Sequence, residues 1–234
     1  MFAPSARFYD AIYSFKDYGK EAAQIEALIR ERRPNARTLL DVACGTGLHL
    51  QHLRESYEVE GLDLEPELLK LARERLVDVP LHEGDMRDFD LGKRFDAVTC
   101  LFSAIGYTKP EEAMGEAIGA MARHLEPAGV LLVEPWLTPE AYQTPHLGSV
   151  FVGEDELAIA RMNIAEQGDG TSVMVFHYLV GTPQGIERFE ERHELGLFTH
   201  EQYLAAFRAA GLAVERDDEG LIGRGLYLGT LQES

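Results

Sequence analysis

Cysteine is scarce in this sequence: Cys44 and Cys100 are the only two among 234 residues. Each lies beside a predicted strand end, and neither has the spacing of a metal-binding knuckle, so we expect two small buried side chains and no metal site. Long apolar runs are also missing, and residues 1–7 lack the basic segment and apolar core of a secretory signal. These absences predict a soluble, cytoplasmic protein that does not bind a membrane.

Basic residues are few. The chain has 22 Lys and Arg against 40 Asp and Glu, a net charge of −18. A charge of this sign repels phosphate backbones and anionic lipid surfaces, and no cluster of Lys and Arg reverses it locally, so we expect no nucleic-acid partner. The hydrophobic content of 45% fits one globular domain with a full core.

A short apolar run ends in an acid and a glycine loop: Leu39-Leu40-Asp41-Val42-Ala43-Cys44-Gly45-Thr46-Gly47. A helical pattern follows, so the stretch predicts a strand, a tight turn and a helix, the first crossover of an open α/β sheet. Gly45 and Gly47 permit backbone angles that a side chain forbids, and they let a ligand lie against the main chain. The loop therefore predicts a cofactor pocket, with a purely structural turn as the alternative.

Two further acids stand at strand ends. Asp63 closes the predicted second strand, near the distance of about 20 residues past the glycine loop at which a carboxylate reaches both hydroxyls of a cofactor ribose. Asp85 follows the predicted third strand, beside Met86. The carboxylate can accept from an adenine amino group while the flexible methionine covers the ring. The sequence thus predicts a nucleoside bound across three neighbouring strand ends.

A nicotinamide dehydrogenase is the main rival interpretation. Its fingerprint requires a third small residue for helix packing over the pyrophosphate, but Leu50 occupies that position. Asp41, below the glycines, attracts an amine and repels phosphate. S-adenosylmethionine carries a ribose, an adenine, a free amine and a sulfonium, which accounts for Asp41, Asp63 and Asp85 together. The residues therefore predict S-adenosylmethionine as the cofactor.

Strands and helices alternate as far as Trp136, which predicts a parallel sheet. These elements are a helix at 21–33, strands at 59–63, 80–82 and 95–102, a helix at 111–125 and a strand at 130–134. Beyond Trp136, turn sequences separate three predicted strands of an antiparallel meander, at 156–167, 171–181 and 186–198. Thr199 then caps a helix that stops at Gly211, and strands at 212–216 and 225–231 close the main sheet as a hairpin.

Three segments resemble class I S-adenosylmethionine-dependent methyltransferases: the glycine loop from Asp41 to Gly47, Gly84-Asp85-Met86-Arg87-Asp88-Phe89, and Val133-Glu134-Pro135-Trp136. More narrowly, nearly the whole chain is similar to the N,N-dimethyltransferases of nucleotide-linked 3-amino-deoxyhexoses. The resemblance implies an α/β fold with a Rossmann-like class I methyltransferase sheet, mostly parallel with the last strand antiparallel, and an inserted antiparallel β meander. Within one domain, 1–136 is then the cofactor-binding core, 137–198 the inserted sheet for substrate or dimer contacts, and 199–234 the helix and closing hairpin.

The same resemblance implies site residues. Cofactor contacts are expected from Tyr9, Tyr18, Ala43, Asp63, Asp85, Met86 and Leu101. Arg161 and Arg224 match positions that hold the phosphates of a sugar nucleotide, a role that suits the bidentate geometry of guanidinium. Trp136 and Tyr107 are expected to line the acceptor pocket, and members of that family carry histidine in the position of Tyr107. They commonly pair through the extra sheet, so we also expect a homodimer.

Methyl transfer from a sulfonium requires an acceptor lone pair in line behind the methyl group, so positioning supplies most of the rate. Tyr107, with an ordinary pKa of about 10, is a poor base at neutral pH, and we expect it to orient the acceptor. We expect His124, His177 and His193 to be structural or surface residues. The predicted reaction is N-methylation of a nucleotide-linked aminosugar; the alternatives are another small amine or hydroxyl acceptor, and a non-catalytic S-adenosylmethionine-binding protein.

Overall fold

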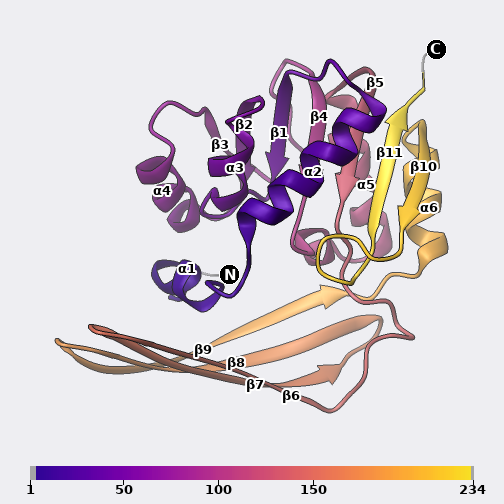
Figure 1. Cartoon of the computed structure of the whole chain (residues 1–234). Helices are drawn as coiled ribbons and strands as arrows, with labels where there is room; N and C mark the ends of the chain where they lie inside the picture. The colour runs from indigo at the N-terminus through magenta and orange to yellow at the C-terminus, as the bar shows by residue number, and fades with distance from the viewer. Residues whose placement is uncertain (1–3, 233–234) are drawn as a thin grey trace.

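The computed structural model describes residues 4–232, so the ends of the predicted segments 1–136 and 199–234 lie outside the described residues. Two β-sheets organise the chain (Figure 1). The seven strands of the main sheet are, in spatial order, β10 (Leu212–Asp217), β11 (Leu226–Leu231), β5 (Leu125–Val133), β4 (Phe95–Cys100), β1 (Thr38–Val42), β2 (Glu58–Asp63) and β3 (Leu81–Glu83). Only β11 pairs antiparallel with its neighbours in this sheet. The predicted class I sheet is confirmed.

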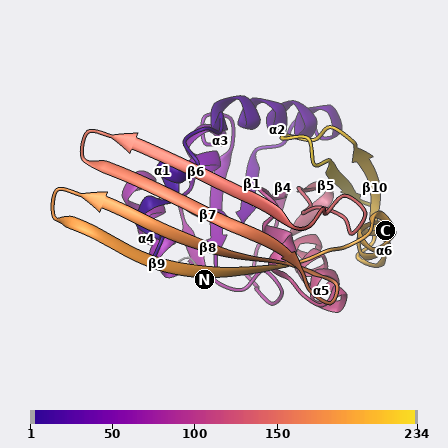
Figure 2. The same ribbon diagram turned by 90° about the horizontal axis from the view of Figure 1, so that it is seen from below.

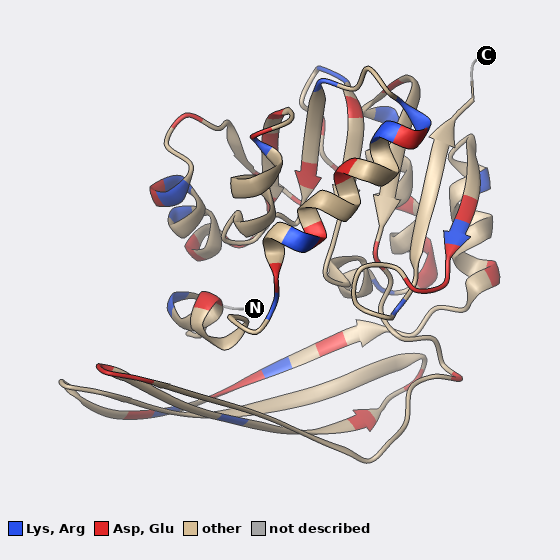
Figure 3. Ribbon diagram, in the orientation of Figure 1, with Lys and Arg blue, Asp and Glu red and all other residues tan. Residues whose placement is uncertain are grey.

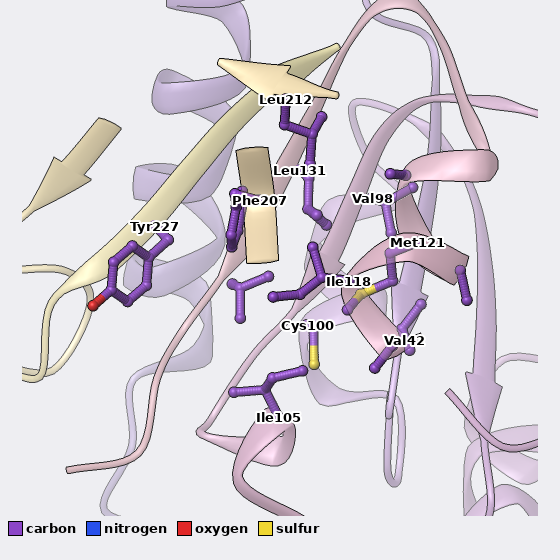
Figure 4. Close-up of a cluster of buried hydrophobic side chains, with 14 of the residues drawn as sticks. Val42, Val98, Cys100, Ile105, Ile118, Met121, Leu131, Phe207, Leu212 and Tyr227 are labelled. Carbon is purple, nitrogen blue, oxygen red and sulfur yellow. The ribbon is translucent and has the colours of Figure 1, made fainter. Parts of the chain in front are cut away.

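Helices cover both faces of the main sheet. One face carries α2 (Tyr18–Arg32), α3 (Leu48–Leu53) and α4 (Pro66–Arg75), and the other carries α5 (Glu111–Arg123) and α6 (His200–Ala209). In α2, Ile25 and Ile29 stand one turn apart and are fully buried, which is why this helix packs along the sheet. On the opposite face, side chains of α5 and α6 interdigitate with β1, β4, β5 and β11 (Figure 4).

The inserted sheet has four antiparallel strands: β6 (His146–Glu154), β7 (Leu157–Gln167), β8 (Thr171–Thr182) and β9 (Gly185–Gly196). The sequence pattern predicts only three, and the prediction missed β6. This edge strand has no fully buried residue and contains Gly148 and Gly153, so it lacks a clear alternation of apolar and polar positions. The sheet lies across the carboxyl ends of the parallel strands, and its outer face is open in the view from below (Figures 1 and 2).

A short N-terminal segment, η1 (Ala6–Phe8) and α1 (Tyr9–Ile12), fills the space between the two sheets. Phe8 and Ile12 pack on the inner face of the small sheet. From the same segment Asp10 accepts a hydrogen bond from the Thr46 hydroxyl at 2.7 Å and pairs with Arg75 at 2.5 Å. The segment thus joins the glycine loop to the small sheet.

Charged residues of both signs are mixed along the helices, as the alternating colours of α2 and α4 illustrate (Figure 3). Within residues 4–232, no helix combines the length and the apolar character needed to cross a membrane.

Candidate active site

The glycine loop turns sharply between β1 and α3. Ala43, Gly45 and Gly47 have positive φ angles of 60°, 57° and 77°. A Cβ on Gly45 would meet no atom within 4 Å, whereas one on Gly47 would lie 2.6 Å from Leu76 Cδ1. Gly45 therefore borders open space, as a ligand-binding glycine must. Gly47, predicted as a cofactor contact, caps α3 and packs against Leu76, and it does not line the cavities described below.

Asp63 closes β2 beside this loop and is 8% exposed. Its Oδ2 accepts the Gly45 N–H at 2.7 Å, and its Oδ1 accepts the Glu65 N–H at 2.8 Å. Burial raises the pKa of the Asp63 carboxyl, while the two N–H groups favour the charged form. A carboxylate oxygen can accept more than one hydrogen bond, so these contacts leave Asp63 able to accept from ligand hydroxyls.

Asp85 stands just beyond β3, at the next strand end. Arg87 binds both of its oxygens, with Nε to Oδ1 at 2.9 Å and Nη2 to Oδ2 at 2.5 Å. The hydrogen bonds from Arg87 lower the pKa of the Asp85 carboxyl. The side chain is therefore charged at neutral pH and held beside Met86, where the predicted adenine contact requires it.

A cavity of about 640 Å³ is lined by residues at the carboxyl ends of the parallel strands and by residues on the inner face of the small sheet. This volume suits a small-molecule site. Most of the predicted site residues line it: Tyr9, Ala43, Gly45, Asp63, Asp85, Met86, Leu101, Tyr107, Trp136, Arg161 and Arg224. The fold thus brings predicted cofactor residues and predicted acceptor residues into one space.

A smaller cavity adjoins the first and is lined by two of the three predicted cofactor residues that remain, Asp41 and Tyr18; the third is Gly47. Asp41 is 2% exposed, and its Oδ1 accepts a hydrogen bond from the Thr99 hydroxyl at 2.7 Å. Burial raises the pKa of Asp41 to about 6. The Tyr18 hydroxyl is buried and has no hydrogen-bond partner within residues 4–232. A polar ligand group in this cavity would satisfy that hydroxyl.

A buried ion-pair network supports the smaller cavity. Glu21 binds Lys16 Nζ at 2.7 Å through one oxygen and His49 Nε2 at 2.8 Å through the other. The Lys16 ammonium also lies 4.2 Å from the centroid of the Phe102 ring. Because His49 and Phe102 both line the smaller cavity, this network holds part of its wall in place.

Arg161 on β7 enters the main cavity from the small sheet. It is 8% exposed, and its guanidinium carbon lies 5.2 Å from the centroid of the Tyr13 ring and 4.8 Å from that of Phe176. Its Nη1 donates to the Tyr13 hydroxyl oxygen at 3.1 Å. The sequence pattern missed Tyr13 and Phe176 as site residues, although Phe176 is an inward position on a predicted strand.

Arg224 enters the same end of the cavity from the β10–β11 connection. Its guanidinium carbon lies 4.6 Å from the centroid of the Trp136 ring, and its Nη1 donates to the Ser103 hydroxyl at 2.9 Å. Trp136 is fixed in turn by a hydrogen bond from its Nε1 to the Ser172 hydroxyl at 2.8 Å. Aromatic rings therefore orient Arg224 and Arg161, and neither guanidinium forms a salt bridge with another described residue.

Tyr107 closes η2 (Ala104–Tyr107) on the cavity wall, and its hydroxyl lies 2.7 Å from His193 Nδ1. His193, expected to be a structural or surface residue, is 2% exposed and also lines the cavity, which the sequence pattern did not predict. The other two histidines are as expected. His124 bonds backbone atoms of Ala120 and Leu91, and His177 is on the exposed face. The alternation of β9, whose odd-numbered residues face inward, was the available signal for His193.

Comparison with known proteins connects this geometry to a reaction. Residues 39–129 match a family model described as a methyltransferase domain. The dTDP-3-amino-3,6-dideoxy-alpha-D-glucopyranose N,N-dimethyltransferase of Streptomyces fradiae is 44% identical over 96% of this chain and 89% of its own length. The chain belongs to the S-adenosylmethionine-dependent methyltransferases. The dehydrogenase and the non-catalytic binding protein, kept as alternatives above, are therefore wrong.

Other relatives of this methyltransferase cover it equally well. The dTDP-4-amino-2,3,4,6-tetradeoxy-D-glucose N,N-dimethyltransferase of Saccharopolyspora spinosa is 40% identical over 96% of this chain and 91% of its own length. The S-adenosylmethionine-bound amino pentose methyltransferase of calicheamicin biosynthesis from Micromonospora echinaspora superposes with a TM-score of 0.88 at 43% identity, covering 95% of this chain and 96% of that one. The predicted cofactor is thus confirmed.

The residues present in this methyltransferase fit its methyl donor. The open space at Gly45 admits a ligand against the main chain, and the Tyr18 hydroxyl, which has no hydrogen-bond partner within residues 4–232, can bond a polar ligand atom. Asp63 and Asp85 offer acceptors for hydroxyl and amino groups at the next two strand ends. The buried carboxyl of Asp41 suits the positively charged part of S-adenosylmethionine.

Proposed function

We propose that this methyltransferase methylates the amino group of a dTDP-linked amino-deoxysugar. The observation that supports the proposal most directly is the set of charged side chains that line the cavity. Asp63 and Asp85 stand at the ends of β2 and β3, whereas Arg161 enters from the small sheet and Arg224 from the β10–β11 connection. The two acids match a cationic nucleoside cofactor, and the two arginines match an acceptor that carries a diphosphate. The two N,N-dimethyltransferases described above are named for dTDP-linked aminosugars.

The methyl donor supplies a carbon bound to a sulfonium: a bond from the acceptor nitrogen to this carbon forms as its bond to sulfur breaks, and that electron pair stays on sulfur. The protein's task is to orient the acceptor and exclude water. Tyr9, Ala43 and Asp63 hold the donor in our proposal, while Tyr107 orients the acceptor amine. The aromatic rings of Trp136 and Phe176 form the acceptor wall.

A panel of acceptors tests the proposal. The purified enzyme is incubated with labelled S-adenosylmethionine and a dTDP-3-amino-deoxyglucose, its 4-amino isomer, the same aminosugar without the nucleotide, and dTDP-glucose. We expect methylation of a nucleotide-linked amine, with mass spectrometry counting one or two added methyl groups. Loss of the nucleotide should lower kcat/KM by about a hundredfold or more, because binding energy from the diphosphate is lost. Equal turnover of the nucleotide-free amine, or methylation of dTDP-glucose, would overturn the assignment.

We further propose that the residues of the predicted insert, 137–198, serve both acceptor binding and dimer formation. The outer face of the small sheet carries an exposed apolar patch formed by Leu147, Phe151, Met162, Ile164 and Leu179. The pairing register places all five on the same face, and β9 borders them with Arg188, Glu190, Arg192 and Glu194. An apolar patch with a charged rim of both signs suits a second copy of this chain.

Multi-angle light scattering after size exclusion tests the dimer. Phe151→Glu should convert a dimer into a monomer, because a charge within the patch would be desolvated at the interface. Val77→Glu is the matched control, since Val77 is 81% exposed on the distant connection between α4 and β3. A monomeric parent would refute the dimer without affecting the proposed reaction. We place the enzyme in the cytoplasm, where its free, buried Cys44 and Cys100 would remain reduced.

A further inference from the structure

Three side chains form a line from the cavity wall into the protein interior. The Tyr107 hydroxyl faces the cavity and contacts His193 Nδ1 at 2.7 Å. On the other side of the imidazole, His193 Nε2 lies 3.5 Å from Glu191 Oε2. His193 and Glu191 are 2% and 5% exposed, and both belong to the inward-facing positions of β9. The line therefore joins the acceptor end of the cavity to a buried carboxylate.

Glu191 is held in its charged form. The Ser5 N–H and hydroxyl donate to its two oxygens at 2.9 and 2.7 Å. Burial opposes ionisation, but the hydrogen bonds from His193 and Ser5 outweigh it, and the pKa of Glu191 is lowered. An ionised carboxylate only accepts hydrogen bonds, so it favours a proton on the imidazole nitrogen that faces it, Nε2 at 3.5 Å. Neutral His193 is thereby favoured as the Nε2–H tautomer.

This tautomer leaves the Nδ1 lone pair of His193 facing Tyr107. Burial raises the pKa of the Tyr107 hydroxyl well above its ordinary value, so the phenol is neutral and donates its hydrogen to Nδ1. The phenol oxygen still has a lone pair that can accept a hydrogen bond from a group in the cavity. A proton accepted by the Tyr107 oxygen can therefore be matched by transfer of the phenol's own proton to His193 Nδ1.

We propose, on the basis of the amine acceptor proposed above, that Tyr107, His193 and Glu191 form a relay that removes the proton from the bound acceptor ammonium. The ammonium proton passes to the Tyr107 oxygen as the Tyr107 proton passes to His193 Nδ1. The acceptor then has the lone pair that attack on the methyl group requires, and the new imidazolium is stabilised by Glu191. After the product leaves, the proton returns through Tyr107 to water.

The other charged and titratable groups around His193 define its electrostatic setting. On β7, Arg161 contacts the Phe176 ring, and the same ring contacts His193 edge-on with a centroid distance of 5.0 Å. On β8, the cross-strand partner of His193 is the uncharged Met174, and Tyr178 lies farther along the strand near Glu191. Beyond η2, Lys109 is neutralised by Glu194 at 2.8 Å. Glu191 is thus the nearest group of opposite charge to a protonated His193.

The pH dependence of kcat/KM for the dTDP-linked amine distinguishes this relay from a structural role. His193→Gln keeps an oxygen that can accept the Tyr107 hydrogen bond, but the amide cannot take a proton. The variant should therefore use only acceptor that is already deprotonated, losing about tenfold for each pH unit below the pKa of the amine. Its activity should approach that of the parent above this pKa. A purely structural role predicts the same loss at every pH.

His82→Gln is the matched control, because His82 also pairs with a glutamate, Glu60 at 2.8 Å, but lies outside the cavity lining. Its pH profile should match that of the parent. Calorimetric titration with S-adenosylhomocysteine should give equal affinities for the parent and both variants, which shows that the fold and the cofactor end are intact. A loss in His193→Gln that is independent of pH, or an unchanged profile, would overturn the relay.

A second variant gives a readout besides activity. In nitrogen-15 NMR spectra of the S-adenosylhomocysteine complex, His193 of the parent should show the Nε2–H tautomer. Glu191→Gln can donate as well as accept, so the tautomer preference should weaken, and the activity loss at low pH should fall between those of the parent and His193→Gln. An Nδ1–H tautomer in the parent would refute the relay. Failure of the parent to methylate any amine would refute the proposed acceptor, and the relay with it.

Discussion

Replacing Asp41 with Asn should stabilise the folded enzyme at neutral pH. Asp41 is buried, and burial, more than any other cause, raises its pKa from 3.8 to about 6. A shift of roughly two units means that the charged form costs ~3 kcal/mol in the folded state relative to the unfolded chain. Asn keeps an oxygen for the Thr99 hydroxyl but brings an amide that also needs a partner. We therefore expect a net gain of about 1–3 kcal/mol, or roughly 2–12 °C in Tm.

The gain should depend on pH in a defined direction. Because the pKa of Asp41 is higher in the folded state, folding retains a proton between about pH 4 and pH 6. The stability that Asp41 contributes is complete below about pH 4 and is lost as the pH rises through about 6. The difference between Asp41→Asn and the parent should therefore be small at the acid end, grow across this window and stay constant above it. Urea denaturation of the ligand-free proteins at several pH values measures it.

The same substitution should weaken cofactor binding. Asp41 lines the smaller cavity, where its carboxylate can attract the positive charge of S-adenosylmethionine. Loss of a charged contact of this kind costs about 1.5–3 kcal/mol, roughly ten- to a hundredfold in Kd by calorimetry. Asp90→Asn is the control, because that side chain is 89% exposed, and it should change neither quantity. If Asp41→Asn is no more stable than the parent at any pH, Asp41 is not a destabilising buried charge and the reasoning fails.

Three further substitutions test other parts of the site. Asp63→Ala should weaken the binding of S-adenosylmethionine by about 2–4 kcal/mol in a calorimetric titration, because the ribose hydroxyls lose a buried acceptor. Unchanged affinity would refute the ribose contact. Arg224→Ala should raise the acceptor KM about ten- to a hundredfold and make that KM less dependent on salt concentration, while cofactor affinity stays unchanged. Kinetics like those of the parent at every salt concentration would refute a diphosphate site. Gly47→Ala should lower Tm, since its Cβ would meet Leu76 Cδ1 at 2.6 Å with φ at 77°; an unchanged Tm would refute this packing.

The cofactor end of the site could be predicted from the sequence because its determinants are local. A strand, a glycine turn and a helix follow one another in the chain, and the carboxyl ends of parallel strands meet at one edge of the sheet. Asp63 and Asp85 could therefore be placed together without knowledge of the tertiary packing. Gly47 shows the limit of this reasoning: whether a loop glycine faces the ligand or its own helix depends on Leu76, which belongs to another element.

The acceptor end depends on how the small sheet docks, and no local pattern encodes that. Arg161 could be placed only through a family resemblance, because the rings that hold it come from Tyr13, just after α1, and from Phe176 on β8. The position of His193 on the cavity wall could not be predicted for the same reason. His193 and Glu191 are two residues apart in the chain, which predicts that they share a face of β9. Only the docking of the small sheet brings that face to Tyr107.

Strand alternation gives the small sheet two separate tasks. Along β7, Arg161 faces the cavity and Met162 faces outward; along β9, His193 faces the cavity and Arg192 faces outward. Because neighbouring residues point to opposite faces, substitutions on the outer face can change assembly without replacing a residue of the site. The two faces nevertheless share one hydrogen-bonded backbone, and shifting the register by one residue would move His193 away from Tyr107. If the outer face pairs with a second copy, pairing would therefore stabilise the register on which the acceptor end depends.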